Sequence, residues 1–218
     1  MDILLIDDHH IFRDGLKLLL QQQESSWAIH AAANAAQARQ AINSSIDFDL
    51  ILLDYNLPDG NGLDLLREIK SIVPATPVAL LSAHEDPQLI QATLAAGASG
   101  FITKSSSSEV MLSALQLIFS GGVYVPPAIL AQNFPSQPTS QTENLSQPVE
   151  KKSSEYHLTE RQLEVLQEMV KGLANKEIAR ELNMSPSTVK AHIAAILREF
   201  DVNNRTQAVT LAQEKGLV

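Results

Sequence analysis

The chain has 218 residues, carries a formal net charge of −9 and contains no cysteine. This length accommodates one or two domains, each with its own core. The missing cysteines exclude disulfides, thiolate metal sites and cysteine nucleophiles. No basic leader precedes the first apolar residues, and no apolar run approaches the roughly 18 residues of a membrane span, so we expect a soluble cytoplasmic protein with no membrane partner.

Charge is unevenly distributed along the chain. Residues 1–125 carry −8, residues 126–150 carry −2 and residues 151–218 carry +1. A charge of −9 taken over the whole chain argues against a polyanionic partner. The uneven distribution instead indicates separate modules with different partners.

Short apolar runs alternate with amphipathic stretches in the first 120 residues. Such runs are typical of strands that are buried on both faces of a parallel sheet, and each is followed by a helical pattern. The predicted strands cover residues 3–6, 27–32, 50–53, 78–81 and 100–103. Because right-handed crossovers place helices on both sheet faces, the pattern predicts a doubly wound α/β domain with five parallel strands over residues 1–120.

Polar residues stand where these predicted strands end. Asp7 and Asp8 follow the first strand, Asp54 the third, Ser82 the fourth and Lys104 the fifth. Ligands of open parallel sheets bind beyond these carboxyl ends. Three carboxylates at one edge repel one another unless a hard cation such as Mg²⁺ lies among them. Such a carboxylate can also attack phosphorus, and a hydroxyl and an ammonium can contact the phosphoryl oxygens.

These residues resemble the receiver domain of two-component response regulators over about residues 1–120. The resemblance implies that Asp54, in the segment LLDYNLPDG, is the phosphorylated aspartate. It also implies that Asp7, Asp8 and Asp54 hold Mg²⁺, directly or through water, together with the backbone carbonyl of Asn56.

The resemblance extends to residues that rearrange on phosphorylation. It implies that the hydroxyl of Ser82 moves toward the phosphoryl group, that Phe101 is an aromatic switch, and that Lys104 contacts the phosphoryl group. Ser105 departs from the pattern, because many receivers have a proline after the lysine, and we therefore do not expect a cis peptide bond there.

Other polar residues near this edge are interpreted as structural. We expect His9, His10 and His84 to be solvent-exposed or packing residues, because nothing beyond proximity in the sequence indicates that they bind a metal. Asp47 and Asp59 are interpreted as solvated loop residues.

Residues 121–153 are rich in proline, glutamine and serine and poor in large apolar side chains. Such a segment buries too little surface to offset the entropy of ordering it. We expect a partly flexible linker here, followed by a second domain over residues 154–218.

The second domain is all helical by pattern. Thr159 and Gln162 predict a capping box, and Ser185 followed by Pro186 predicts the start of another helix. Helices are predicted from residue 160, over 175–182, from residue 186 and over 206–214. The second and third of these form a candidate helix-turn-helix.

This domain resembles the four-helix LuxR-type DNA-binding domain of the NarL/FixJ subfamily. The resemblance lies in residues 158–166, 172–179 and 187–193, and it implies that the helix from Pro186 enters the major groove. We expect Lys190, Ala191 and Ala194 to face outward toward base edges. The full set of predicted DNA-contacting residues is Lys176, Arg180, Ser187, Thr188, Lys190, Ala191, Ala194 and Arg198. A charge of only +1 predicts weak binding by one domain, so we expect a homodimer on a pseudo-palindromic site.

Together these features predict a transcription regulator that is not an enzyme and that a histidine kinase switches by phosphorylating Asp54. The resemblance further implies that the receiver covers the groove-reading helix until phosphorylation, and RNA polymerase is a further candidate partner. One alternative is a DNA-binding dimer that works without phosphorylation. Another is an aspartyl-nucleophile phosphatase of the haloacid dehalogenase type, which fits less well because its nucleophile follows the first strand in a D-x-D arrangement, whereas Asp7 and Asp8 are adjacent.

Overall fold

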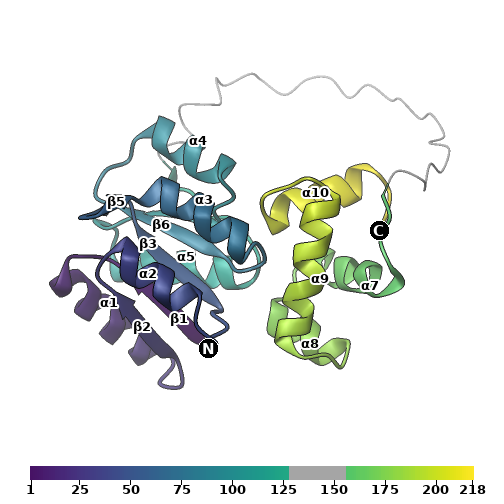
Figure 1. Cartoon of the computed structure of the whole chain (residues 1–218), viewed down its shortest axis with the longest axis horizontal. Helices are drawn as coiled ribbons and strands as arrows, with labels where there is room; N and C mark the ends of the chain where they lie inside the picture. Colours follow the sequence, from purple (N-terminus) through teal and green to yellow (C-terminus); the bar gives the residue numbers. More distant parts are fainter. Residues whose placement is uncertain (128–155) are drawn as a thin grey trace.

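The computed structural model describes residues 1–127 and 156–218 (Figure 1). Most of the predicted linker, residues 128–153, lies outside the described residues. The described parts form an α/β unit followed by a helical unit.

The α/β unit is built on a five-stranded parallel sheet with the strand order β2-β1-β3-β6-β7. The strands are β1 (Asp2–Ile6), β2 (Ala28–Ala32), β3 (Leu50–Asp54), β6 (Val78–Ser82) and β7 (Gly100–Thr103). A small antiparallel ribbon of β4 (Asn56–Leu57) and β5 (Gly60–Asn61) follows β3. The predicted doubly wound fold is confirmed, and each strand boundary lies within one residue of the prediction.

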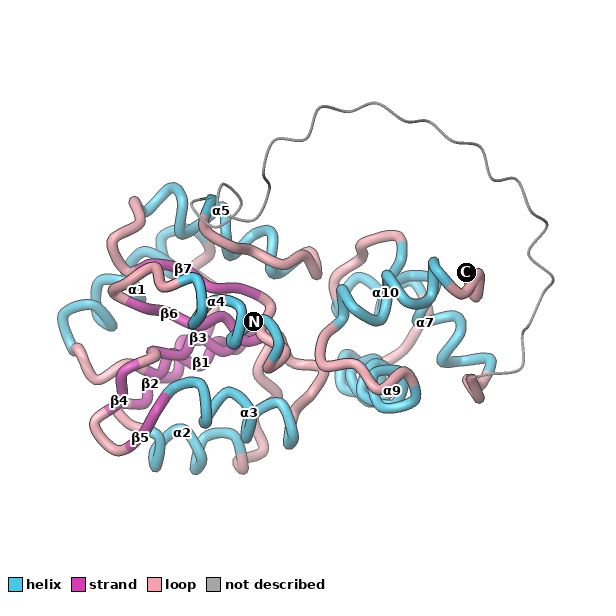
Figure 2. Tube along the Cα trace, turned by 90° about the horizontal axis from the view of Figure 1, so that it is seen from above, coloured by secondary structure: helices cyan, strands magenta, loops and turns pink. Residues whose placement is uncertain are grey.

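Five helices cover the two faces of this sheet. They are α1 (His10–Gln23), α2 (Ala35–Ile42), α3 (Gly62–Ile72), α4 (Pro87–Ala95) and α5 (Ser108–Phe119). Successive strand residues point to opposite faces. Leu4 therefore packs in one core with α2, α3 and α4, while Leu5 packs in the other with α1 and α5. Figure 2 shows α2 and α3 on one side of the sheet and α1 and α5 on the other.

The helical unit contains α7 (Glu160–Val170), α8 (Asn175–Glu181), α9 (Pro186–Glu199) and α10 (Arg205–Glu214). The capping box is confirmed, because the Thr159 side chain accepts from the Gln162 backbone and the Gln162 side chain accepts from the Thr159 backbone. Ser185 caps α9, with Pro186 at its first position. The inward face of this helix is buried and consists of Val189, Ile193 and Ile196, followed by Phe200 at its end.

Gly62 allows α3 to begin directly against the end of β3. Its backbone N–H donates to the Tyr55 carbonyl at 2.7 Å. A Cβ atom at this position would lie 2.3 Å from the Asp54 carbonyl oxygen and 2.6 Å from the Tyr55 Cα. Since both neighbours are backbone atoms, a side chain here must displace the turn that carries Asp54.

We predict that Gly62→Ala lowers the free energy of unfolding of the protein by about 2 kcal/mol, the cost of overpacking a close contact. Urea unfolding followed by circular dichroism measures this change. Gly60→Ala is the matched control, because a Cβ atom there meets none of the described residues within 4 Å. Equal stabilities of the two variants would contradict the steric argument.

Candidate functional site

The carboxyl ends of four strands meet at one edge of the sheet. The parallel register pairs Ile6 with Leu53, Asp54 with Leu81, and Ser82 with Thr103. The residues at or just after these ends therefore come together, as the strand pattern predicts.

Asp7 and Asp54 are buried at this edge and lie on either side of one ammonium group. Asp7 is 0% and Asp54 1% exposed. The Lys104 Nζ lies 2.8 Å from Asp7 Oδ2 and 2.8 Å from Asp54 Oδ2. Neither of these two buried oxygens accepts a hydrogen bond of good geometry from the described residues. The pair is therefore held mainly by the charge of Lys104, whose Nζ also lies 4.9 Å from the centre of the Phe12 ring.

This environment shifts the ionisation of Asp54. Burial raises the pKa of the Asp54 carboxyl, and the negative charge of Asp7 raises it further. Lys104 and a backbone hydrogen bond from Asn56 oppose the shift, but the net direction of the pKa is upward. Holding Asp54 ionised therefore costs free energy in the absence of a further cation.

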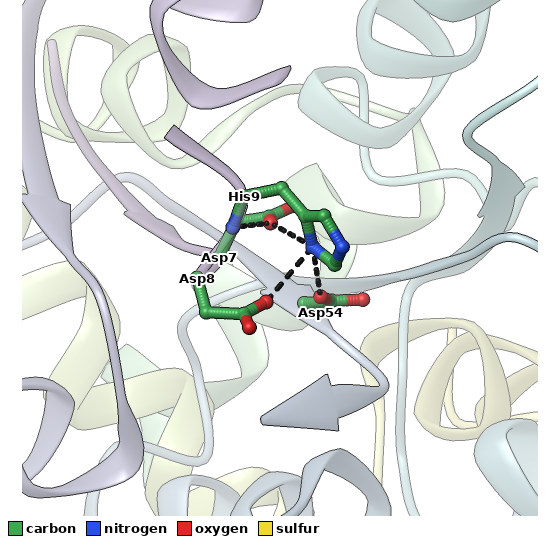
Figure 3. A group of neighbouring side chains, drawn as sticks. All are labelled: Asp7, Asp8, His9 and Asp54. Carbon is green, nitrogen blue, oxygen red and sulfur yellow. Dashed lines mark hydrogen bonds and ion pairs between the residues drawn. The ribbon is translucent and has the colours of Figure 1, made fainter. Parts of the chain in front are cut away.

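Asp8 and His9 complete the edge of the site. Asp7, Asp8, His9 and Asp54 each offer one ligand atom, and these atoms lie within 4.8 Å of one another (Figure 3). Three carboxylates and the Lys104 ammonium leave excess negative charge, so the donor set fits a divalent cation. A pocket opens above Asp54, and its other lining residues are His9, Ile11, Phe12, Asn56, Ala83 and Lys104.

The predicted switch residues Ser82 and Phe101 form no hydrogen bond or ion pair with these carboxylates among the described residues. The Ser82 hydroxyl donates to the His84 carbonyl at 2.9 Å and accepts from the His84 N–H at 3.2 Å. Phe101 is fully buried in the core beneath α2, α3 and α4. The peptide bond between Lys104 and Ser105 is trans.

The predicted DNA-contacting residues of α9 are not all open to solvent. Ser187, Thr188, Ala191 and Arg198 are exposed and Ala194 is half-buried. Lys190 is only 8% exposed, because its side chain points out of the helical unit and is covered by the receiver. On α8, Arg180 is exposed and Lys176 is half-buried.

The receiver covers Lys190. Its Nζ donates to Asp47 Oδ1 at 2.6 Å and to the Phe48 carbonyl at 2.7 Å. The Lys176 Nζ lies 3.0 Å from Asp49 Oδ2. Asp47 is an exposed loop residue, as interpreted, but it also pairs with a lysine that is 143 residues away in the sequence.

The docked helical unit lies at the sheet edge opposite to Asp54. Asp47 and Asp49 come directly before β3, whereas Asp54 ends it. A second contact joins the Asn203 side chain to the Ala95 carbonyl at 3.1 Å, next to Gly97. Gly97 has a φ of +93°, and a Cβ atom there would lie 2.6 Å from the Asn203 carbonyl oxygen.

Sequence reasoning missed several of these contacts. The nearness of His9 to the carboxylates had a signal, since His9 directly follows Asp7 and Asp8. Asp59 is exposed, as interpreted, but it also accepts hydrogen bonds from the Ala35 and Ala36 N–H groups at the start of α2, which are 24 and 23 residues away in the sequence. The pairing of Asp47 with Lys190 had no local signal, because it depends on how two domains dock.

The chain matches two family descriptions. Residues 3–116 match the response regulator receiver domain, and residues 156–212 match the bacterial regulatory proteins of the luxR family. The chain therefore belongs to the response regulators that join a receiver to a LuxR-type DNA-binding domain. This family consists of DNA-binding transcriptional regulators and not of enzymes, so the phosphatase alternative is set aside.

Curated relatives share this organisation along nearly their whole length. The "Glycerol metabolism activator" of Pseudomonas putida is 37% identical over 210 residues, which cover 96% of this chain and 94% of the relative. The "Transcriptional regulatory protein LnrK" of Bacillus subtilis is 34% identical over 215 residues, with 99% and 97% covered. The "Nitrate/nitrite response regulator protein NarP" of Escherichia coli is 32% identical over 215 residues, with 98% and 95% covered.

Solved structures support the fold of the receiver. A LuxR-family two-component response regulator from Aurantimonas sp. SI85-9A1 has a TM-score of 0.55 and 29% identity, and the match covers 60% of this chain and 92% of that one. A LuxR-family DNA-binding response regulator from Silicibacter pomeroyi has a TM-score of 0.52 and 34% identity, with 59% and 98% covered. Within the described parts of the chain, helices that combine the length and apolarity needed to cross a membrane are absent.

We predict that Asp54→Asn stabilises the metal-free protein. The amide keeps the shape of the carboxylate but removes its repulsion with Asp7 and its cost of burial, so we expect the receiver transition to rise by about 4 °C in calorimetry. Mg²⁺ should stabilise the parent more than the variant. Asp14→Asn, at an exposed position of α1, is the control.

The stabilisation should also depend on pH with a defined sign. Because the pKa of Asp54 is raised on folding, the folded parent holds this proton more tightly than the unfolded chain. The parent therefore loses stability relative to Asp54→Asn as pH rises from the ordinary carboxyl range through the raised pKa. A parent that is more stable than the variant at pH 7 without Mg²⁺ would contradict this account.

Proposed function

We propose that this protein is a transcription regulator switched by phosphorylation of Asp54. The observation that carries the proposal is the position of the Asp54 carboxylate, which is buried at the end of β3, lies 2.8 Å from Lys104 and opens into a pocket. The donor is the phosphohistidine of a partner kinase or a small acyl phosphate.

The residues of the pocket have separate roles in this transfer. An Asp54 carboxylate oxygen forms a bond to phosphorus while the phosphorus–nitrogen bond of the phosphohistidine breaks, and the imidazole leaves with a proton from solvent. Asp7, Asp8, Asp54 and the backbone carbonyl of Asn56 would hold Mg²⁺, which supplies positive charge for the transferring phosphoryl group. Lys104 adds a fixed ammonium beside the same oxygens.

The phosphoryl group offers Ser82 a new hydrogen-bond acceptor. In the free receiver the Ser82 hydroxyl is bonded to the His84 backbone. We expect it to exchange these bonds for a charge-assisted bond to a phosphoryl oxygen, which draws the β6–α4 loop inward. Phe101 then repacks into the space that the loop vacates, so that the receiver changes between two packed states.

DNA and the receiver compete for the same lysines. We expect Lys190, Ala191 and Ala194 to meet base edges, and Lys176, Arg180, Ser187, Thr188 and Arg198 to position the helix on the sugar–phosphate backbone. In the docked arrangement Lys190 and Lys176 are instead paired with receiver carboxylates. The unphosphorylated chain is therefore held away from DNA.

β3 joins the phosphorylation site to the docking site. Asp54 ends this strand, and Asp47 and Asp49 directly precede it. A shift of β3 and of the packed loops beside it is the route by which phosphorylation weakens the pairing of Asp47 with Lys190.

The released DNA-binding domains act in pairs. A charge of +1 over residues 151–218 supplies few phosphate contacts per chain, so we propose a phosphorylated homodimer on a pseudo-palindromic promoter site, with RNA polymerase as a further partner. The functional units are the receiver over residues 1–120, the linker over 121–153 and the DNA-binding domain over 154–218. We propose a cytoplasmic location, because a bacterial DNA-binding regulator works where the DNA lies.

We predict that Asp54→Asn abolishes the response to phosphodonor. Binding is measured by fluorescence anisotropy on promoter fragments that the parent protein recovers from its genome, with and without acetyl phosphate and Mg²⁺. Acetyl phosphate should strengthen binding by the parent about tenfold or more and increase its dimer fraction in sedimentation, and neither change should occur in the variant. A parent that binds equally tightly in both conditions would instead favour the phosphorylation-independent dimer.

We predict that Asp47→Asn strengthens DNA binding by the unphosphorylated protein. Losing the charged partner of the Lys190 hydrogen bond costs the docked state about 1.4 kcal/mol, so DNA affinity should rise by up to tenfold without phosphodonor. The same anisotropy assay measures this change, with Asp14→Asn as control. Substituting Asp47 is cleaner than substituting Lys190, because Lys190 is also expected to contact DNA. If Asp47→Asn binds DNA with the affinity of the parent, the contact between Asp47 and Lys190 does not inhibit DNA binding.

A further inference from the structure

His9 faces the carboxylates of the acidic pocket. Its Nδ1 lies 2.8 Å from Asp8 Oδ1, 3.3 Å from Asp7 Oδ1 and 3.8 Å from Asp54 Oδ2 (Figure 3). Its backbone N–H donates to Asp7 Oδ1 at 2.8 Å, which fixes the turn from β1 into α1. The ring is 65% exposed, as expected, but its nitrogen points at three acidic side chains and not into solvent.

The spacing of these groups matches the coordination shell of one ion. Ligand atoms at about 2.1 Å from a metal lie roughly 3 Å apart when adjacent and roughly 4.2 Å apart when opposite. The four ligand atoms of Asp7, Asp8, His9 and Asp54 lie within 4.8 Å of one another, so a small contraction brings them to these distances.

A second observation also indicates a cation. Asp7 Oδ2 and Asp54 Oδ2 are fully buried and share one ammonium, Lys104 Nζ, which lies 2.8 Å from each of them. Buried carboxylates are normally each paired with a cation or bound to a metal. Lys104 supplies one positive charge. The negative charge of the other carboxylates then remains for a divalent ion to neutralise.

We propose that His9 Nδ1 is a metal ligand in this pocket, which gives the site one nitrogen and three carboxylates. This inference rests on the metal pocket of the proposed function and concerns its ion preference. Mg²⁺ takes oxygen ligands, whereas imidazole favours Mn²⁺, Co²⁺ and Zn²⁺ in increasing degree relative to Mg²⁺. The site therefore selects such ions over Mg²⁺ through His9.

The added ligand also affects phosphorylation. Zn²⁺ held by four protein ligands is closed to further ligands, whereas a six-coordinate ion keeps open positions for a phosphoryl oxygen. Zn²⁺ bound through His9 therefore blocks phosphorylation of Asp54 while Mg²⁺ or Mn²⁺ supports it.

The test uses the full chain after removal of metals by chelation. Calorimetric titrations with Co²⁺ and with Mg²⁺ are compared for the parent, His9→Ala and His10→Ala, the last being the matched control at the next exposed position. We expect His9→Ala to lower the affinity for Co²⁺ at least tenfold, because removing even an outer partner of a metal ligand costs 10–100-fold, and to change the affinity for Mg²⁺ less than twofold. His10→Ala should match the parent with both ions.

A spectroscopic measurement identifies the ligand directly. Electron spin-echo spectroscopy of the Mn²⁺-loaded parent should show coupling to an imidazole ¹⁴N nucleus, and His9→Ala should lack it. Zn²⁺ should inhibit phosphorylation of the parent by acetyl phosphate and Mg²⁺ at lower concentrations than for His9→Ala. Parent protein without ¹⁴N coupling, or equal Co²⁺ affinities of the two histidine variants, would overturn the proposal.

The outcomes also separate this inference from the proposed function. If the parent binds neither Mg²⁺ nor Co²⁺, the metal pocket itself is wrong. If it binds both ions and His9→Ala changes neither affinity, only the role of His9 fails. Circular dichroism of His9→Ala confirms folding, and His9→Gln serves as a second variant that keeps a polar side chain without a ring nitrogen.

Discussion

The buried ion pair between Asp54 and Lys104 is the interaction around which the receiver is organised. A carboxylate that is 1% exposed, beside a second buried carboxylate, is costly to ionise unless cations surround it. Lys104 lies 2.8 Å from both carboxylates, yet the pKa of Asp54 is still raised. A divalent ion, and the proposed conversion of the Asp54 carboxylate into an acyl phosphate that Lys104 contacts, would both relieve this cost.

Strand β3 connects this pocket to the contact between the domains. Its last residue is Asp54, and the loop before its first residue carries Asp47 and Asp49. All five of its residues are buried, so β3 cannot shift without moving the helices on both faces. In the proposed switch, this packing is the route by which phosphorylation of Asp54 at one edge of the sheet reaches the other edge without a direct contact between Asp54 and the helical unit.

Lys190 is the residue at which docking on the receiver and the proposed DNA binding exclude each other. Its ammonium donates to a carboxylate and a backbone carbonyl of the receiver, and these bonds satisfy most of its hydrogen-bonding capacity. In the proposed DNA-bound state, a DNA phosphate or base edge replaces both of these bonds. Each hydrogen bond to a charged group contributes about 1.5–3 kcal/mol, so modest changes in the receiver suffice to shift the balance.

Local patterns in the sequence determined the two folds and the residues of the acidic pocket. The apolar runs identified the five strands, and in a parallel sheet their ends must meet, so Asp7, Asp54 and Lys104 came together as expected. The capping residues Thr159 and Ser185 likewise marked helix starts, because a cap acts on the backbone within three residues. Only the tertiary structure decided that His9 turns toward the carboxylates and that Lys190 is covered by Asp47. The first depends on a rotamer and a turn geometry, and the second on the docking of two domains through contacts more than 100 residues apart, which no periodicity in the sequence records.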